Sequence, residues 1–205
     1  MNQLVRAARP ADAEAIGRIH SESWRLTYAG LVSSRYLATL DDDLLAERWR
    51  QRLSGPRGES SLLVAEQAGD VIGFALFGPS GDRDLDDGFA GEVQMLYVLP
   101  AGQRRGHGRA LFERAAADLA ARRASGATAP SIRGPDGPRS HARFARFYWL
   151  VVWVVEQNLA ARAFYRRLGL LPDGAQRTDM LGGQAVPVVR YAAPLNPLID
   201  FARLT

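Results

Sequence analysis

The 205-residue chain contains no cysteine and no lysine. The lack of cysteine excludes disulfides, thiolate metal ligands and thiol nucleophiles, and it agrees with a reducing compartment. The lack of lysine excludes Schiff-base chemistry and a Walker-type phosphate loop, in which a lysine holds the terminal phosphates. Any reaction that this chain catalyses therefore uses neither a thiol nor a lysine amine.

Long apolar runs are missing as well. The longest covers residues 147–155, which is well short of the roughly 20 residues that a membrane helix needs. The N-terminal sequence MNQLVRAARPADAE has no apolar signal core. We therefore expect a cytoplasmic protein without a membrane partner.

The basic charge comes from arginine alone. All 26 basic residues are arginine, and 22 acidic residues leave a net charge of only +4. The isoelectric point is high because arginine does not titrate below about pH 12. A nucleic-acid footprint would need clustered charge, so we expect no nucleic-acid partner.

Length and composition predict one domain. The chain is long enough for a sizeable core, and 47% of it is hydrophobic. We expect a single domain over residues 1–192 and a tail over 193–205. Strand and helix periodicities follow one another without a repeat, which predicts a mixed α+β fold. Strands are expected over 4–7, 61–67, 71–77, 92–98 and 147–155 and in a hairpin around Gly182 and Gly183; helices are expected over 12–24, 41–53, 106–123 and 158–168.

One connection is unusually long. A helix-to-strand connection usually has about 2–6 residues, but residues 125–146 separate the helix ending near 123 from the strand at 147. The Gly/Pro-rich part over 125–143 is therefore an insertion. It is rich in arginine, with Asp136 as its one acid. We expect a solvated loop, with a substrate lid or a partner surface as the alternative.

A loop rich in glycine and arginine joins the strand over 92–98 to the helix that follows. Backbone N–H groups at a helix start, together with the helix dipole, form an anion site suited to a pyrophosphate. Gly106 and Gly108 let the backbone approach the phosphates, and the arginines add charge. The loop predicted to bind the anion is Gln103, Arg104, Arg105, Gly106, His107, Gly108 and Arg109.

The spacing Gln-x-x-Gly-x-Gly after Val-x-Pro resembles the acyl-CoA signature of the GNAT superfamily of N-acetyltransferases. Leu111 stands where a Rossmann fingerprint needs its third glycine. Asn158, followed by Tyr165 seven residues later, resembles the second signature of the family. Trp24, Tyr28 and residues 47–49 (Glu-Arg-Trp) resemble the N-terminal region of a bacterial branch. The resemblance covers residues 4–191.

This resemblance implies a twisted mixed sheet with helices on both faces, splayed between the strands over 92–98 and 147–155. Acetyl-CoA, as a co-substrate, would lie in the splay and pair with the backbone of Leu96, Tyr97 and Val98, because a parted strand leaves N–H and C=O groups unsatisfied. The N–H of Leu96 would polarise the thioester carbonyl. Asn158 would bind the pantetheine arm, and it also suits a helix cap.

The resemblance also implies the catalytic groups. Tyr165 would be the general acid, and it is equally compatible with a core position. Glu92 is the candidate base; unless a bulge intervenes, strand alternation places it on one face with Leu96 and Val98. Trp24 and Tyr28 would wall the acceptor site, together with Leu31 and Tyr36, although Trp24 also suits the core.

Two further groups of residues bear on the substrate. The aspartates at 82, 84, 86 and 87 fit a solvated loop, or they attract a cationic amine. Trp153 stands where the branch that acetylates protein N-termini has a glutamate base, which disfavours that activity. The three histidines show no metal-ligand spacing, and we expect His107 to be solvated and no metal to bind.

The sequence therefore predicts an acetyl-CoA-dependent N-acetyltransferase that acts on a small-molecule amine by direct transfer. Two alternatives are a non-catalytic acyl-CoA-binding module and a protein or peptide amine acetyltransferase. A third is a basic interaction protein that uses the arginine-rich insertion. A homodimer stays open as the oligomeric state.

Overall fold

A computed structural model describes residues 4–56, 58–82, 84–85, 90–124, 133–134, 137–138 and 149–195. Most of the insertion lies outside the described residues, as do Asp86, Asp87, the first two residues of the strand expected from 147, and residues 196–205. The insertion contributes two described strands, β5 (Arg133–Gly134) and β6 (Gly137–Pro138), which pair with each other.

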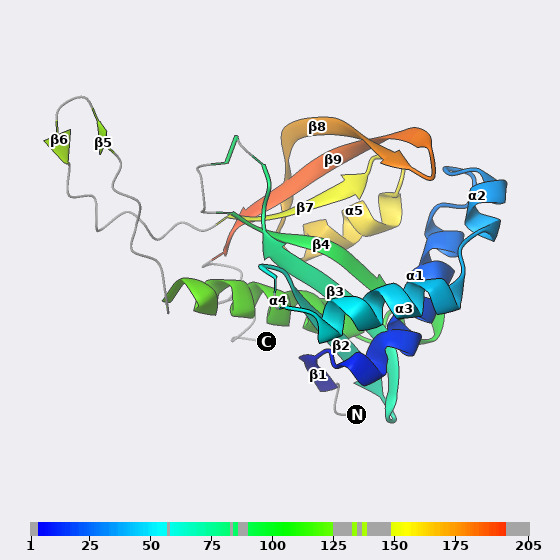
Figure 1. Cartoon of the computed structure of the whole chain (residues 1–205). Helices are drawn as coiled ribbons and strands as arrows, with labels where there is room; N and C mark the ends of the chain where they lie inside the picture. Colours follow the sequence, from blue (N-terminus) through cyan, green and yellow to red (C-terminus); the bar gives the residue numbers. More distant parts are fainter. Residues whose placement is uncertain are drawn as a thin grey trace.

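A seven-stranded mixed sheet forms the centre of the protein (Figure 1). Its order is β1-β2-β3-β4-β7-β9-β8, and every neighbouring pair is antiparallel except β4 and β7. The strands match the sequence expectations to within about two residues at each described end. They are β1 (Leu4–Ala7), β2 (Ser61–Gln67), β3 (Asp70–Pro79), β4 (Ala90–Val98), β7 (Trp149–Val155), β8 (Leu171–Leu181) and β9 (Gln184–Pro194).

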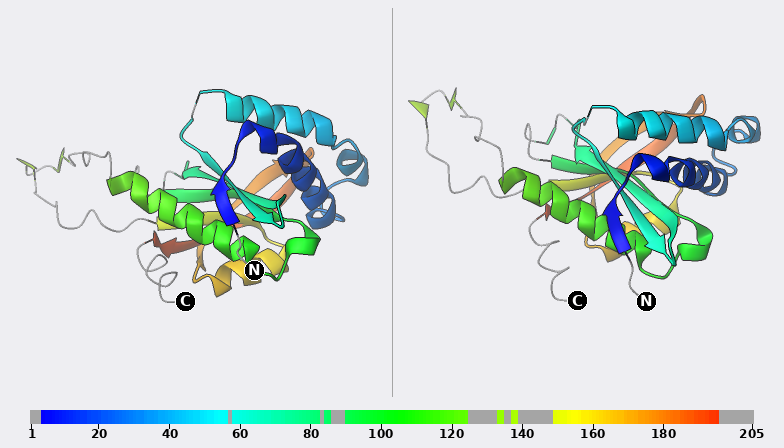
Figure 2. Two further views of the ribbon diagram at one scale, coloured as in Figure 1. Left: turned by 90° about the horizontal axis from the view of Figure 1, so that it is seen from below. Right: turned by 60° about the horizontal axis from the view of Figure 1, so that its bottom comes forward.

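The helices cover both faces of this sheet, and Figure 2 shows α1 and α3 on one face and α4 and α5 on the other. We call these the α1 face and the α4 face. The sequence predicted four helices but not α2, whose five residues are too few for a periodic pattern. The helices are α1 (Ala13–Thr27), α2 (Ser34–Ala38), α3 (Asp42–Ser54), α4 (His107–Ala124) and α5 (Leu159–Arg167). None of the described helices is both long and apolar enough to span a membrane.

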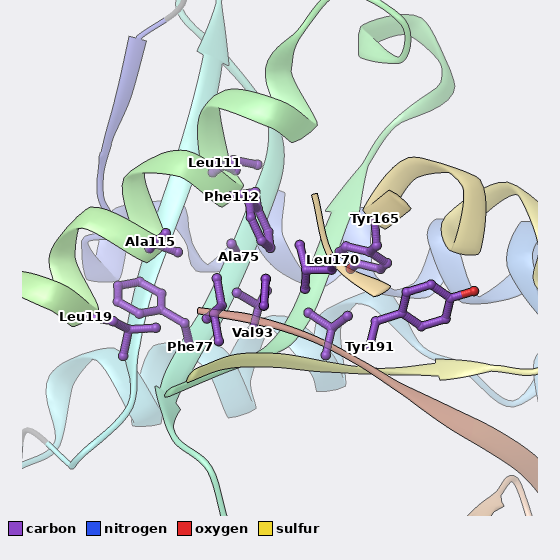
Figure 3. Close-up of a cluster of buried hydrophobic side chains, with 14 of the residues drawn as sticks. Ala75, Phe77, Val93, Leu111, Phe112, Ala115, Leu119, Tyr165, Leu170 and Tyr191 are labelled. Carbon is purple, nitrogen blue, oxygen red and sulfur yellow. The ribbon is translucent and has the colours of Figure 1, made fainter. Parts of the chain in front are cut away.

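Each face has its own core. On the α1 face, Ile16 and Ile19 of α1 and Trp49 of α3 pack against Phe74 of β3. At Gly17 a Cβ atom would lie 2.6 Å from the backbone nitrogen of Ala46, so the two helices approach too closely for any side chain there. On the α4 face the core is larger, and Figure 3 shows part of it, including Phe77, Phe112, Leu119 and Tyr191.

The two central strands part soon after they meet. Ala90, Gly91 and Glu92 of β4 pair with residues 149–151 of β7, and no pairing follows between the later residues of these two strands. The β7 strand then pairs with β9 along its whole length. The splay predicted between the central strands is therefore confirmed, and it leaves the β7-facing edge of β4 open beyond Glu92.

Candidate active site

The free edge of β4 presents backbone groups from alternate residues. The Leu99 N–H donates to the Ile72 carbonyl of β3 (2.9 Å). Alternation along an antiparallel strand therefore turns the backbone of Tyr97 toward β3 and that of Leu96 and Val98 toward the opening. The expectation that all three residues offer backbone groups to a ligand is wrong for Tyr97, because its N–H and C=O face β3.

The loop after β4 is held against this edge. Gln103 donates its side-chain Nε2 to the Val98 carbonyl (2.9 Å), so this amide fixes the loop to the strand. A short 3₁₀ turn (Pro100–Gly102) directly precedes Gln103. Arg104 and Gly106 then have φ angles of 58° and 89°. Only glycine adopts such left-handed values without strain, so the loop has a defined and partly strained shape.

This loop ends at the start of α4, where the first N–H groups of the helix have no carbonyl partner within the helix. Arg104 and Arg105 are exposed beside this helix start, and Arg109 pairs with Glu113 of the next turn (2.6 Å). Backbone donors, the helix dipole and cationic side chains therefore meet here. This arrangement fits the diphosphate of a CoA molecule.

His107 differs from the expectation. Its ring is 4% exposed, and its Nε2 lies 3.2 Å from Oε1 of Gln67 at the end of β2. Burial lowers the pKa of His107, so the ring is neutral and joins the loop to the β2–β3 hairpin. The expectation of a solvated side chain is wrong, because α4 directs this ring inward.

Gly108 lies on the wall of the opening. A Cβ atom here would lie 3.4 Å from the Phe164 ring and 3.8 Å from Leu96. Gly108 therefore brings α4 close to the α5 side chains and to the free edge of β4. The backbone at this position is within reach of whatever fills the opening.

Asn158 and Tyr165 occupy opposite ends of α5. The Asn158 side-chain oxygen accepts the Ala161 N–H (3.0 Å) and caps the helix, as expected. Tyr165 lies in the α4-face core, close to Phe112 and Leu170 (Figure 3). Burial, with a smaller effect from the Tyr28 phenol, raises the pKa of Tyr165. Tyr165 is therefore protonated at every physiological pH.

The Glu92 side chain lies on the opposite face of the sheet from the face that the sequence predicted. Val93 pairs with Phe77, but Met95 pairs with Leu76, so Gln94 is an extra residue in β4. Such a bulge reverses the alternation of side chains on its two sides. Glu92 therefore lies on the α1 face, whereas Leu96 belongs to the α4-face core. The prediction that Glu92 shares a face with Leu96 and Val98 is wrong.

The surroundings of Glu92 make it a weak acid. Burial raises its pKa to about 7, with contributions from the Asp82 and Asp179 carboxylates, while the Arg177 guanidinium acts in the opposite direction. A carboxyl group with a pKa near 7 is charged about half of the time at neutral pH. It can therefore accept a proton and release it again within one reaction cycle.

Aromatic side chains also gather on the α1 face. Trp24 lies 4.8 Å from the Tyr28 ring and 6.2 Å from the Tyr36 ring, measured between ring centroids. The indole Nε1 of Trp24 is buried, and it interacts with the Tyr97 phenol. Burial and the adjacent Tyr28 phenol raise the pKa of Tyr97. Trp24 and Tyr28 are thus placed together, as expected for an acceptor wall.

The loop aspartates are not simply solvated. Asp82 and Asp84 bind Arg190 of β9, and Arg190 is only 4% exposed. Asp82 also accepts a hydrogen bond from Trp153 Nε1 (2.9 Å). No sequence pattern pointed to Arg190, because Arg190 follows Asp82 by 108 residues and only the β7–β9 pairing brings it next to Trp153.

Within the described residues, no group of three or more His, Asp or Glu side chains is placed to hold a metal ion. His20 instead stacks on Tyr97, with 5.7 Å between the ring centroids, and accepts a hydrogen bond from Trp49 Nε1 (3.3 Å). Burial lowers the pKa of His20 to about 4. It is therefore a neutral member of the aromatic cluster.

Comparison with solved structures agrees with the fold. The PaiA N-acetyltransferase from Thermoplasma acidophilum, solved in complex with coenzyme A, superposes with a TM-score of 0.59 over 95% of this chain and 99% of that one, at 17% identity. An N-acetyltransferase from Staphylococcus aureus Mu50 superposes with a TM-score of 0.60 over the same shares, also at 17% identity. At this identity the match shows the shared fold.

Two related sequences and one family model also match the chain. The uncharacterized N-acetyltransferase YuaI of Bacillus subtilis is 31% identical over 155 residues, which cover 75% of this chain and 72% of that protein. The probable N-acetyltransferase Rv2775 of Mycobacterium tuberculosis is 28% identical over 193 residues, which cover 93% of this chain and 92% of that protein. The model of the acetyltransferase (GNAT) domain matches residues 58–169. The predicted resemblance is confirmed, and the chain belongs to the GNAT family of acetyltransferases.

Proposed function

We propose that this acyltransferase moves an acetyl group from acetyl-CoA directly to the amine of a small molecule. The observation that carries the proposal is the opening between β4 and β7. The opening has a free strand edge and an anion-binding helix start on one side, and a carboxyl group with a pKa of about 7 on the other. The CoA-bound PaiA structure, which shares this fold, supports the choice of donor.

The donor side of the opening would hold acetyl-CoA, which supplies an acetyl group activated as a thioester. The C=O group of Leu96 and the N–H group of Val98 face the opening and can pair with the amide groups of a pantetheine arm. The N–H of Leu96 would also donate to the thioester carbonyl oxygen, where negative charge develops during attack. The loop from Gln103 to Arg109 would bind the diphosphate, and the amide of Asn158 would bind the arm.

Glu92 is the proposed base. An alkyl amine with a pKa near 10.4 reaches the site mostly protonated, and it must lose a proton before its nitrogen can attack the thioester carbon. Glu92 faces the α1 side, where Trp24 and Tyr28 wall the space, and it would take this proton directly or through one water molecule. The proton then returns to solvent when the product leaves.

Tyr165 is the proposed acid. As the carbon–sulfur bond breaks, the leaving thiolate needs a proton, and Tyr165 is the protonated group that α5 brings to the opening. In addition to burial, the Tyr28 phenol contributes to the raised pKa of Tyr165, and both Tyr28 and Tyr165 contribute to the raised pKa of Tyr97, which supports a place for Tyr165 near the aromatic acceptor wall. The chain has no cysteine to carry an acetyl group, so the amine attacks the thioester itself.

A small acceptor is favoured over a protein N-terminus. The β7 position at which a protein-acetylating relative would carry a base holds Trp153, whose indole is bound to Asp82 and covered by Arg177. This part of β7 therefore offers no proton acceptor. Glu92 on β4 then has to serve as the base.

The direct test is a panel of primary amines incubated with the protein and acetyl-CoA, with released CoA detected by a thiol reagent. The protein itself contributes no signal, because it has no thiol. We expect one chemical class of amines to stimulate CoA release, and Tyr165→Phe to abolish that stimulation. If calorimetry shows CoA binding but no amine stimulates release, the protein is a non-catalytic acyl-CoA-binding module.

A further inference from the structure

Arg190 gathers three carboxylates on the α1 face. Its guanidinium binds Asp173 (2.7 Å), Asp82 (3.1 Å) and Asp84 (2.5 Å). The arginine side chain is 5% exposed and the Asp82 side chain 10%. A buried guanidinium needs such partners. The segment between β3 and β4 is thereby attached to β9 at a defined place.

The Trp153 indole packs against these charged groups. It is the cross-strand partner of Arg190, and its Nε1 donates to Asp82 (2.9 Å). The guanidinium of Arg177 lies over the same ring, 4.1 Å from its centroid, and approaches Asp82 to 3.6 Å. Asp82 therefore has three fixed partners from β7, β8 and β9. Its position is determined by the folded sheet.

Glu92 is next to this cluster. It pairs with Val151 of β7, and Trp153 lies two residues further along the same strand and on the same face. The charged groups that act on Glu92 are Asp82 from the β3–β4 segment and Arg177 and Asp179 from β8. Counting Asp84 and Asp173, four carboxylates face the two guanidinium groups of Arg177 and Arg190, so the cluster has two excess negative charges.

We propose that Asp82 and Arg177 are positioning residues that set the basicity of Glu92 in opposite directions, with Arg190 and Trp153 holding Asp82 in place. The inference rests on the proposed function, in which Glu92 is the base. A negative charge beside Glu92 favours the protonated carboxyl, and a positive charge favours the carboxylate. Burial and the Asp82 charge together make Glu92 a stronger base than an ordinary glutamate, which makes proton transfer from an ammonium group less unfavourable.

The test is a ¹³C NMR titration of the Glu92 side-chain carboxyl in the free protein, assigned by its absence in Glu92→Gln. The measurement needs no acceptor and no acetyl-CoA. We expect a midpoint near 7 in the unmodified protein. Asp82→Asn should lower the midpoint by roughly half a unit to one unit, and Arg177→Gln should raise it by roughly half a unit, since a single nearby charge has effects of this size.

Asp173→Asn is the matched control. Asp173 also binds Arg190, but it is not among the groups that act on Glu92. A merely structural role of the Arg190 cluster would make Asp82→Asn and Asp173→Asn behave alike. The inference requires a shift in Asp82→Asn and none in Asp173→Asn. Equal midpoints in the two variants, or an unchanged midpoint in Arg177→Gln, would overturn it.

The second arm separates this inference from the proposed function. The dependence of kcat/KM on pH, and in particular its fall at acidic pH (the acidic limb), is measured for Glu92→Gln with the amine that the CoA-release panel identifies. If the limb persists in that variant, Glu92 is not the base, and the proposed function loses its base assignment. If the limb disappears but the NMR midpoint of Glu92 is the same in Asp82→Asn, Arg177→Gln and the unmodified protein, the base assignment stands and the charge-setting role is wrong. If Asp82→Asn does not fold, Arg177→Gln decides alone, because the Arg177 side chain is 43% exposed and we expect its replacement to leave the fold intact.

Discussion

The two sides of the opening between β4 and β7 differ in which parts of the chain form them and in the kinds of side chain that they present. The donor side comes from two continuous stretches, residues 96–109 and 158–165, and it is backed by the apolar core of the α4 face. The acceptor side is assembled from α1, the β3–β4 segment and strands β7 to β9, and it is aromatic and charged. The donor side is suited to one fixed ligand. The acceptor side depends on how distant segments meet, and we propose that substrate choice is set there.

The largest effect is expected from the donor side. Tyr165→Phe keeps the buried ring and removes the proton, so kcat should fall by about 10²–10⁴-fold, as for the loss of a general acid. Binding of CoA should be unchanged, because the ring still fills the core. The measurement is steady-state CoA release together with calorimetry. A variant that binds CoA normally and keeps a near-normal kcat would remove Tyr165 from the mechanism.

Glu92→Gln tests the acceptor side. The base works only as the carboxylate, so kcat/KM of the unmodified protein should fall as the pH drops through about 7 and then decrease tenfold for each further unit. The glutamine variant should lack this limb and be about 10²-fold slower at pH 8, since water can also accept the proton. Asp118→Asn, which changes the half-buried partner of Arg114 on α4, is the control and should keep the limb.

Gly106→Ala tests the shape of the phosphate loop. Gly106 has a φ of 89°, and a left-handed conformation costs other residues about 1–2 kcal/mol. CoA binding should therefore weaken by about 5- to 30-fold in calorimetry. Gly174→Ala is the matched control, because Gly174 has a φ of 93° in an open position on β8. Equal CoA affinity in the two variants would contradict a role for the loop.

The smallest effect is expected from Trp24→Phe. This change keeps an aromatic wall but removes a buried N–H that lies beside the Tyr97 phenol. Loss of one hydrogen bond of about 1 kcal/mol should raise the KM of the acceptor roughly fivefold. The KM of acetyl-CoA should not change. A rise in the KM of acetyl-CoA alone would place Trp24 on the donor side.

The sequence predicted local features of the site, such as the helix cap at Asn158, better than it predicted which way single side chains face, and the reason is physical. The loop around Gly106 and the cap at Asn158 are local features, whose spacing along the chain carries the information. The bulge at Gln94 gives no such signal, and it reverses the face on which Glu92 lies. Arg190 and Asp82 meet only because β7 pairs with β9 after the sheet has formed. Long-range contacts of this kind are not encoded in any local pattern.

The central claim is that the edge of β4 facing β7 holds the donor. Amide hydrogen exchange measured with and without CoA tests this most directly, because exchange slows where a ligand covers or pairs with the backbone. The account predicts slower exchange at Leu96 and Val98, whose backbone groups face the opening, and at the α4 start, with little change along β8 and β9. Protection confined to other elements, or unchanged exchange in β4 while calorimetry reports CoA binding, would contradict it.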